Sequence, residues 1–207
     1  MSLLIQPTEQ KSKEPKLPEG THIARFIQAV DLGRQESKFT KGEFSNMIRL
    51  TFEFPEITKQ WAEDEPAKPV VYGIDVTSCI SEGSNLFKVL KACDNTITHT
   101  KAQDPEAFLG LPFQVNVIHA VSKKGNKYVK LQNFAAIPRN PSNPKQYRFD
   151  IPEQFNDSVA YSIKAHPRNW DKLQDWLQEI IAGSTTFQEK TGQPQPAESL
   201  DDDDLLQ

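Results

Sequence analysis

The stretch from Phe44 to Phe54 alternates apolar and polar residues, and this alternation constrains the fold more than any other feature of the chain. Its apolar side holds Phe44, Ile48, Leu50, Phe52 and Phe54, and its polar side holds Ser45, Met47, Arg49, Thr51 and Glu53. A period of two is typical of a β-strand with one buried face. We expect Pro55 to end this strand, because proline cannot donate to a β-ladder.

Four more runs have strand-like composition, at residues 22–32, 70–80, 112–121 and 128–137. Between the third and fourth strands, Ser84 precedes Leu86, Phe87 and Leu90 at helical spacing, which predicts a capped helix. Three strands, a helix and a final two-stranded hairpin are the element order of a five-stranded OB-type barrel. The predicted fold class is therefore mainly β, although other small barrels and sandwiches also fit the pattern.

The composition changes along the chain and predicts four segments. Residues 1–19 are expected to form a flexible N-terminal arm, and residues 20–137 the OB-fold barrel. Residues 138–187 are expected to form a proline-rich linker and a helix that packs on the barrel, with the helix at 166–183. Its predicted apolar stripe consists of Trp170, Leu173, Trp176, Leu177 and Ile180. Residues 188–207 lack a core-forming pattern and are expected to be a disordered acidic tail.

The net charge of −4 is unevenly distributed. Residues 188–207 carry six acids and one lysine, a net charge of −5, which leaves +1 on the other residues. An acidic run with an apolar end can occupy a basic groove or dock into a pocket of another protein. The predicted partner-binding tail is Asp201, Asp202, Asp203, Asp204, Leu205 and Leu206. We expect deletion of residues 188–207 to strengthen nucleic-acid binding.

The sequence contains no pattern that indicates catalysis. Its four histidines lack metal-ligand spacing to one another or to a cysteine, and no phosphate loop or nucleophile elbow is present. We therefore expect a non-enzymatic protein without a cofactor or metal. Cys79 and Cys93 are interpreted as two buried free thiols, with a single disulfide as the alternative. The chain lacks a signal-peptide core and a membrane-length apolar segment, so a cytoplasmic protein without membrane association is expected.

Basic and aromatic residues gather where an OB-type barrel grips oligonucleotides, on the second and third strands and in the two loops that flank them. Lysine and arginine would follow the phosphates, and aromatic rings would stack on bases. The candidate DNA-binding residues are Arg25, Arg34, Lys38, Phe39, Lys41, Arg49, Trp61, Tyr72, Lys123, Lys124, Lys127, Tyr128 and Lys130. The alternative for each of these residues is a purely structural role, because hairpin lysines are often only solvated and most aromatic residues lie in cores.

Several segments carry a resemblance to a known family. They are LPEGTHIARFIQAVDLGRQE at 17–36, SEGSNLFKVLKA at 81–92, the last hairpin at 109–138, FDIPEQF at 149–155 and NWDKLQDWLQEIIAGS at 169–184. Together they resemble bacteriophage-encoded single-stranded-DNA-binding proteins with an OB fold. The acidic tail is similar to that of bacterial single-strand-binding proteins, whose tip recruits replication and repair partners. The resemblance implies a role in phage DNA replication or recombination in the host cell cytoplasm.

The function predicted from the sequence is binding of single-stranded DNA without strong sequence preference. The acidic tail would modulate affinity and recruit replication or recombination proteins. One alternative is a protein-interaction or virion accessory β-barrel that does not bind nucleic acid. Another is an OB-type nuclease, which would require a divalent-metal site. RNA binding is a variant of the first reading, because discrimination depends on contacts to the 2′-hydroxyl.

Overall fold

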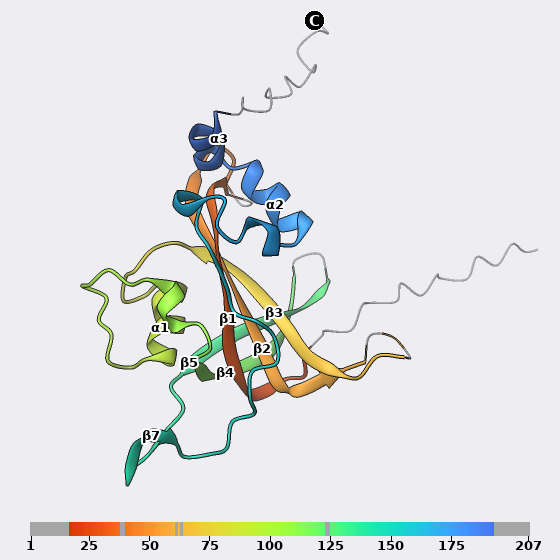
Figure 1. Cartoon of the computed structure of the whole chain (residues 1–207), viewed down its shortest axis with the longest axis vertical. Coiled ribbons are helices and arrows are strands. Elements are labelled where there is room, and N and C mark those ends of the chain that lie inside the picture. The colour runs from red at the N-terminus through yellow and green to blue at the C-terminus, as the bar shows by residue number, and fades with distance from the viewer. Residues whose placement is uncertain (1–16, 38–39, 61, 63, 123–124, 193–207) are drawn as a thin grey trace, which may run out of the picture.

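The chain folds into a mainly β structure whose largest sheet has six strands (Figure 1). The computed structural model describes residues 17–37, 40–60, 62, 64–122 and 125–192. The strands of this sheet are β1 (Gly20–Glu36), β2 (Phe44–Lys59), β3 (Lys68–Thr77), β4 (Pro112–Val121), β5 (Lys127–Ala135) and β8 (Val159–Tyr161). The expected mainly β class is confirmed, as is the helix between the third and fourth strands, which is α1 (Asn85–Cys93).

The strands follow the order β3-β2-β1-β4-β5, with antiparallel pairing along the whole path. β8 lies outside this path and pairs in parallel with the middle of β1. β3 and β5 are the two ends of the path, and the described residues form no ladder between them. Between these two end strands, the hydroxyl of Tyr72 in β3 donates a hydrogen bond of 2.9 Å to the carbonyl of Val129 in β5. The two end strands therefore approach each other.

The second strand is longer than the sequence predicted, and the expectation that Pro55 ends it is wrong. β2 continues to Lys59 and still pairs with β3 at Thr58 and Lys59. The register of the ladder shifts between Phe54 and Thr58, so Pro55 falls in an interruption of the pairing. Such an interruption removes the need for a donor at the proline nitrogen.

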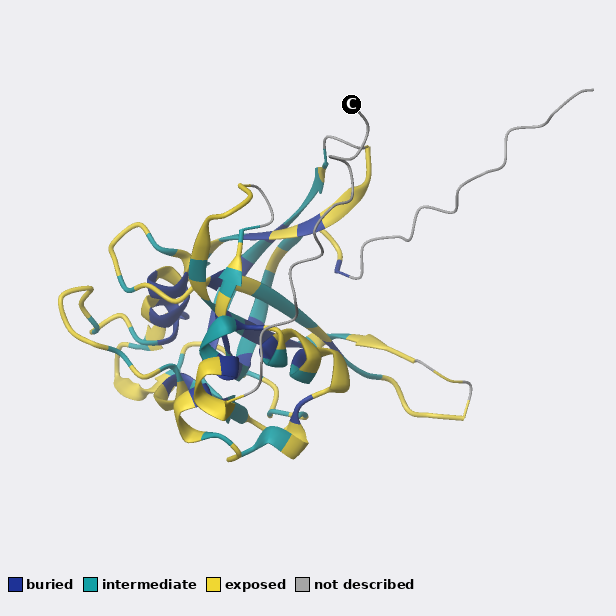
Figure 2. Cartoon of the chain, turned by 90° about the horizontal axis from the view of Figure 1, so that it is seen from above, coloured by how far each residue is buried: buried dark blue, intermediate teal, exposed yellow. Residues whose placement is uncertain are grey.

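The main core lies between the strands and α1. Phe26, Phe52 and Phe113 are fully buried, and the rings of Phe52 and Phe113 meet edge to face at 5.2 Å between centroids. α1 begins at the expected cap, where the Ser84 hydroxyl accepts a hydrogen bond from the Phe87 amide at 3.2 Å. Figure 2 shows burial concentrated in α1 and in the middle of the strands, while the hairpin ends are exposed. A short 3₁₀ helix, η1 (Pro105–Phe108), precedes β4.

The single helix predicted at residues 166–183 is divided. The structure has a 3₁₀ turn, η3 (Trp170–Lys172), followed by α2 (Asp175–Ala182), because Leu173 and Gln174 between them have extended backbone. A further helix, α3 (Thr185–Thr191), runs past the expected start of the acidic tail at residue 188. The buried side of this segment is not the apolar stripe that the sequence predicted. Leu173, Leu177 and Ile181 are buried, whereas Trp176 and Ile180 are exposed.

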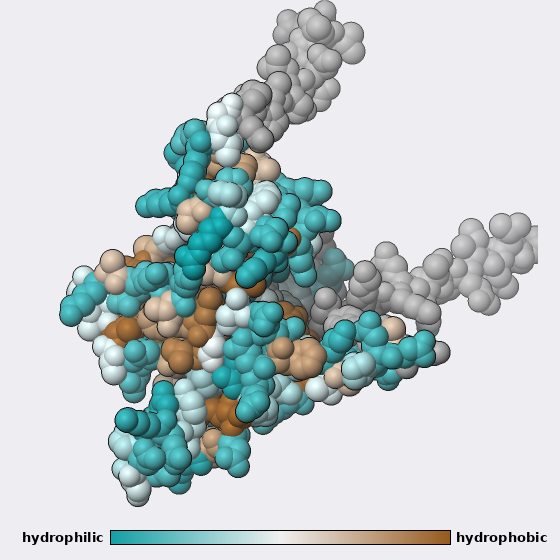
Figure 3. Space-filling view, in the orientation of Figure 1, coloured by the Kyte–Doolittle hydropathy of each residue, from teal (hydrophilic) through white to brown (hydrophobic). Residues whose placement is uncertain are grey.

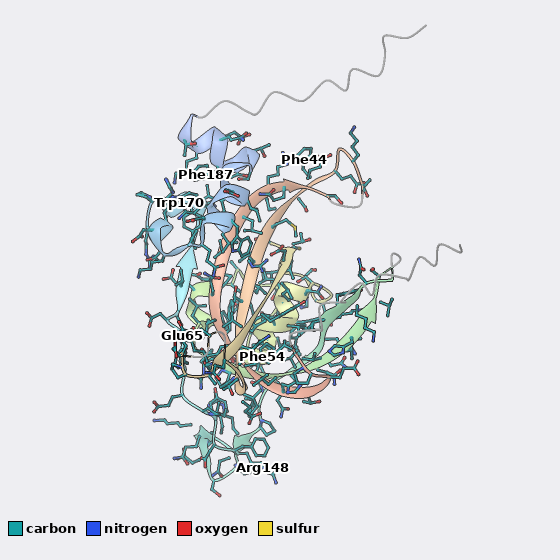
Figure 4. All side chains as sticks on the ribbon, turned by 90° about the vertical axis from the view of Figure 1, so that its right-hand side faces the viewer. Phe44, Phe54, Glu65, Arg148, Trp170 and Phe187 are labelled. Atoms are coloured by element: carbon teal, nitrogen blue, oxygen red, sulfur yellow. The ribbon has the colours of Figure 1, made fainter. Side chains whose placement is uncertain are left out.

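These helices cover one end of β1 and enclose a second core. Its buried members are Val30, Leu32, Tyr161, Ile163, Leu173, Leu177, Ile181 and Phe187. At its centre the rings of Trp170 and Phe187 stack at 5.3 Å between centroids (Figure 4). Gly33 lies beneath this cluster at φ +73°, and a Cβ there would collide with Ser184 and Ile163. Only glycine allows β1 and the helices to come this close.

The segment predicted as a linker contains a small hairpin. β6 (Arg139–Asn140) pairs with β7 (Asn143–Tyr147) and projects from the end of the molecule opposite α2 and α3 (Figure 1). The chain then returns along the sheet to β8 and to a 3₁₀ turn, η2 (Ile163–Ala165). Among the described residues, no helix is long and apolar enough to cross a membrane.

Candidate nucleic-acid interface

A groove of about 750 Å³ lies on the outer face of β2 and β3, beside the start of α2. The register of these strands places Arg49 opposite Asp75, and Thr51 opposite Gly73, on the face that points away from the main core. The opposite wall comes from Gln174, Trp176 and the returning chain at Asn156 and Asp157. Ile27 and Gln28 of β1 complete the lining, so the groove combines three strands, the start of one helix and one extended segment.

Arg49 is the basic residue of this groove. Its Nη1 donates to Asp75 Oδ1 at 2.6 Å, and its guanidinium lies 4.6 Å from the ring centre of Trp176. The guanidinium also lies against Gly73, where a Cβ would be only 2.7 Å from Nη2. Arg49 is thus held flat between a backbone without a side chain and an aromatic ring, an arrangement in which a cation–π contact adds to the ion pair.

Trp176 supplies the aromatic surface of the groove. Its indole Nε1 donates to Gln174 Oε1 at 2.5 Å, and 41% of the residue is exposed. A large aromatic side chain that is both fixed in orientation and exposed is a suitable platform for an unstacked base. The sequence prediction assigned Trp176 to a docking stripe and therefore missed it, because its orientation depends on α2 beginning only at Asp175.

The charge within the groove is nearly balanced. Arg49 is paired with Asp75, and Asp157 adds a second carboxylate to the lining. Phosphates would therefore gain little from the groove alone, and stacking would supply most of its affinity. Further exposed basic side chains lie on the β1–β2 and β4–β5 hairpins.

The first of these hairpins joins β1 and β2. Arg34 is exposed on β1, and its guanidinium lies 5.6 Å from the ring centre of Phe44, which is 45% exposed. Lys41 is exposed in the turn. The structure thus brings the predicted Arg34 and Lys41 together with an aromatic residue that the sequence assigned to the apolar side of a strand.

The second hairpin joins β4 and β5. Tyr128 and Lys130 are exposed on the outer face of β5, whereas Val129 and Leu131 between and beside them point into the core. Lys127 is exposed at the start of the strand. These three predicted residues form one basic and aromatic edge. The remaining predictions, Lys38, Phe39, Trp61, Lys123, Lys124 and the tail residues Asp201 to Leu206, lie outside the described residues.

Arg25, a candidate residue of the first strand, forms hydrogen bonds within the fold. Its two terminal nitrogens donate to the carbonyls of Gly110 at 2.7 Å and Pro152 at 2.5 Å, and its Nε is buried. The returning chain covers this part of β1, so the guanidinium ties two segments of backbone together. Arg25 is half-buried, and both of its terminal nitrogens are engaged by backbone carbonyls.

Tyr72 is also placed differently from the prediction. Tyr72 pairs with Phe52 in the β2–β3 ladder, and its ring packs against the main core. Its hydroxyl donates a hydrogen bond to the carbonyl of Val129. Burial raises the pKa of this hydroxyl, with Arg49 acting weakly in the other direction. Tyr72 contributes to the wall of the groove, but its ring is not a free stacking surface.

The polar face predicted for β2 is partly covered. Glu53 is fully buried and accepts hydrogen bonds from the amides of Phe155 and Asn156 at 3.0 and 2.7 Å, and from the Asn156 side chain at 2.7 Å. The returning chain is anchored here, and this anchor places Asn156 and Asp157 beside the groove. The alternation of the sequence identified the outer face of β2 but gave no sign that another segment covers one half of it.

The two cysteines differ in environment. Both are free thiols, but only Cys93 is buried, so the interpretation of Cys79 as buried is wrong. Burial raises the pKa of Cys93 to about 12, with a smaller contribution from Asp94. The residues that the structure describes contain no group of three or more histidine, cysteine or acidic side chains arranged to hold a metal ion.

Comparisons of the chain with protein-family models and with curated proteins found no match.

Proposed function

We propose that this protein binds single-stranded DNA, without strong sequence preference, in the groove between β3 and α2. The observation that carries the proposal is the stack of Arg49 on Trp176, which presents an exposed aromatic ring beside a guanidinium on the outer face of a β-sheet. Bases of any identity can stack on such a ring, at about 1–3 kcal/mol for each base.

The strand order supports an OB-type barrel as the scaffold. The path β3-β2-β1-β4-β5 with a helix between β3 and β4 is the order expected for that fold, and the Tyr72 bridge to β5 lies where such a barrel closes. We infer a barrel that is partly open between β3 and β5. In this fold, oligonucleotides bind across the second and third strands, between the hairpins that carry Lys41 and Lys130.

The biological role proposed is phage DNA replication or recombination, without catalysis, in the cytoplasm of a host cell. It rests on the resemblance of the sequence segments to phage single-strand-binding proteins. The acidic tail would lower affinity by competing for the basic hairpins and would recruit replication or recombination proteins. The competition is supported by the tail's charge of −5 beside a body of charge +1, and the recruitment by the resemblance of the tail.

The experiment that tests the proposal is a fluorescence-anisotropy titration of labelled oligo-dT with the full-length protein at low and moderate salt. We expect binding that weakens steeply with salt, because phosphate contacts release counterions. Trp176→Ala should weaken binding about 5- to 150-fold, whereas Trp176→Phe should retain most of the affinity because it keeps a ring. Absence of binding at low salt would exclude the proposed function and favour a protein-interaction barrel.

A further inference from the structure

The β6–β7 hairpin carries basic side chains and no acidic side chain. Residues 138–149 contain Arg139, Lys145 and Arg148 and no acidic residue, and they also contain Tyr147 and Phe149. All three basic residues are exposed, and Phe149 is 47% exposed. Figure 3 shows a mainly hydrophilic surface at the end of the molecule where Figure 1 places β7, and Figure 4 shows Arg148 at that end. The candidate interface described above does not include this hairpin.

The hairpin has a defined geometry. Its ends are joined by the hydrogen bond from the Arg148 amide to the Pro138 carbonyl at 2.9 Å. Its turn is held by the side chains of Asn140 and Asn143, which accept from the amides of Ser142 and Lys145 at 3.0 and 3.2 Å. The ladder between β6 and β7 is short, and these side-chain hydrogen bonds hold the turn that joins the two strands. The basic residues therefore project from a fixed support.

An Arg–Tyr stack faces a pocket at the base of the hairpin. The guanidinium of Arg139 lies 3.9 Å from the ring centre of Tyr147, and both residues line a cavity of about 310 Å³. Leu111, Pro112 and Ile137 give this cavity an apolar wall. A cleft of this size, lined by an aromatic ring, apolar side chains and polar groups, lies at the lower end of the range of small-ligand sites.

Asp94 and Asn95 supply the polar part of the pocket. Asp94 Oδ1 accepts hydrogen bonds from the amide and the hydroxyl of Thr96 at 2.9 and 2.8 Å. These bonds hold the pKa of Asp94 below its usual range, and the nearby Arg139 acts in the same direction. The Asp94 carboxylate lines the pocket and can accept a hydrogen bond from an N–H group of a molecule bound there.

We propose that the β6–β7 hairpin is a second contact for the single strand, with one base stacked on Tyr147 in this pocket and the adjacent phosphates held by Lys145 and Arg148. The inference rests on the proposed function and extends it to a site outside the barrel face. Proteins that bind single strands combine these two elements, a basic track and aromatic stacking surfaces, at successive points along the strand.

One oligonucleotide is long enough to reach both sites. Arg148 and Asn156 are eight residues apart, so their Cα atoms are separated by at most about 29 Å. Asn156 lines the groove beside Trp176. A strand of about 25 nucleotides, at about 3.4 Å for each nucleotide, extends well beyond that separation. An oligo-dT of this length is therefore the appropriate probe.

The test compares variants of the full chain by anisotropy with this oligo-dT at several salt concentrations. The double variant Lys145→Glu/Arg148→Glu should bind about tenfold more weakly at low salt, and the slope of log affinity against log salt should fall by about 1.4. The matched control is Lys88→Glu/Lys101→Glu, which makes the same change of charge at exposed positions of α1 and the following loop. Tyr147→Ala should lose about 5- to 150-fold, and Tyr147→Phe should restore binding.

The outcomes separate this inference from the proposed function. If the wild-type protein binds oligo-dT and the hairpin variants bind as tightly as the control, the hairpin is not a contact and the proposed function stands. If the hairpin variants lose affinity only for a blunt duplex and not for oligo-dT, the inference is also wrong. If the wild-type protein binds no oligo-dT, the proposed function itself fails.

Discussion

Gly73 is the residue on which the geometry of the groove depends most directly. It leaves room for the guanidinium of Arg49, which any Cβ at this position would displace. The sequence analysis left this glycine outside the candidate site, since its importance arises from a side chain on the neighbouring strand. Arg49 was predicted because strand alternation alone places it on the outer face, but its partner Trp176 was not.

We predict that Gly73→Ala weakens binding of oligo-dT while leaving stability nearly unchanged. The new methyl group pushes only the flexible end of Arg49 aside, which breaks the stack on Trp176 without disturbing the backbone. The expected loss of affinity is about 1 kcal/mol. Anisotropy and thermal unfolding measure the two effects. The control is Gly83→Ala, where the added Cβ meets open space, and an equal loss of affinity in both variants would contradict the account.

Glu53 is a polar residue whose role the sequence could not reveal. Alternation placed it on a solvent-facing side, yet it is fully buried and accepts three hydrogen bonds from residues 155 and 156. Those partners are about a hundred positions away in the sequence. Long-range contacts of this kind leave no local pattern, which is why the burial of Glu53 could not be predicted from the alternation of β2.

We expect Glu53→Ala to lower the free energy of unfolding by about 3 kcal/mol, because it leaves buried N–H donors without an acceptor. Urea denaturation provides the measurement. Glu56→Ala, at an exposed position of the same strand, is the control and should change stability by less than about 0.5 kcal/mol. If the two variants were equally stable, the returning chain would not be anchored at Glu53.

At the scale of elements, the strands were more predictable than the C-terminal helices. Period-two patterns and capping residues are local, and they correctly located β4 at residues 112–121 and the start of α1 at Ser84. The break at Leu173 and Gln174 is not marked by glycine or proline, so apolar spacing alone suggested one helix. The position of the break rotates the buried face and exposes Trp176.

The helix α3 provides a test at this scale, since the sequence placed its last residues in the tail. Phe187 is 4% exposed and stacks on Trp170 within the second core. We predict that Phe187→Ala costs about 3–5 kcal/mol in the free energy of unfolding. Glu189→Ala, on the exposed side of the same helix, should cost almost nothing. Equal stability of the two variants by denaturant titration would show that α3 does not pack on the sheet.

For the whole molecule, charge is separated between the body and the tail. Residues 193–207 carry five acids and no base, which leaves +1 on residues 1–192. The original expectation placed the start of the tail at 188, but residues 188–191 belong to α3, and Gln188 is buried. A deletion that begins at residue 188 would therefore disturb the second core as well as remove charge.

We predict that deletion of residues 193–207 strengthens binding of oligo-dT at low salt by about tenfold, and that the gain shrinks as salt rises, since charges more than about 10 Å apart are screened at 0.1 M salt. Replacement of Asp201 to Asp204 by asparagine in the full-length chain should reproduce most of the gain. Anisotropy measures both. Unchanged affinity at low salt in both proteins would mean that the tail does not compete with DNA.

The central claim is that a single strand lies across the outer face of β2 and β3 beside α2. Photochemical crosslinking of the full-length protein to oligo-dT, followed by mass spectrometry of the crosslinked peptides, tests it most directly. The account predicts crosslinks at Trp176 and at Tyr128, with the Trp176 crosslink weakened in Gly73→Ala. Crosslinks confined to residues outside the groove, the flanking hairpins and the β6–β7 hairpin would contradict it.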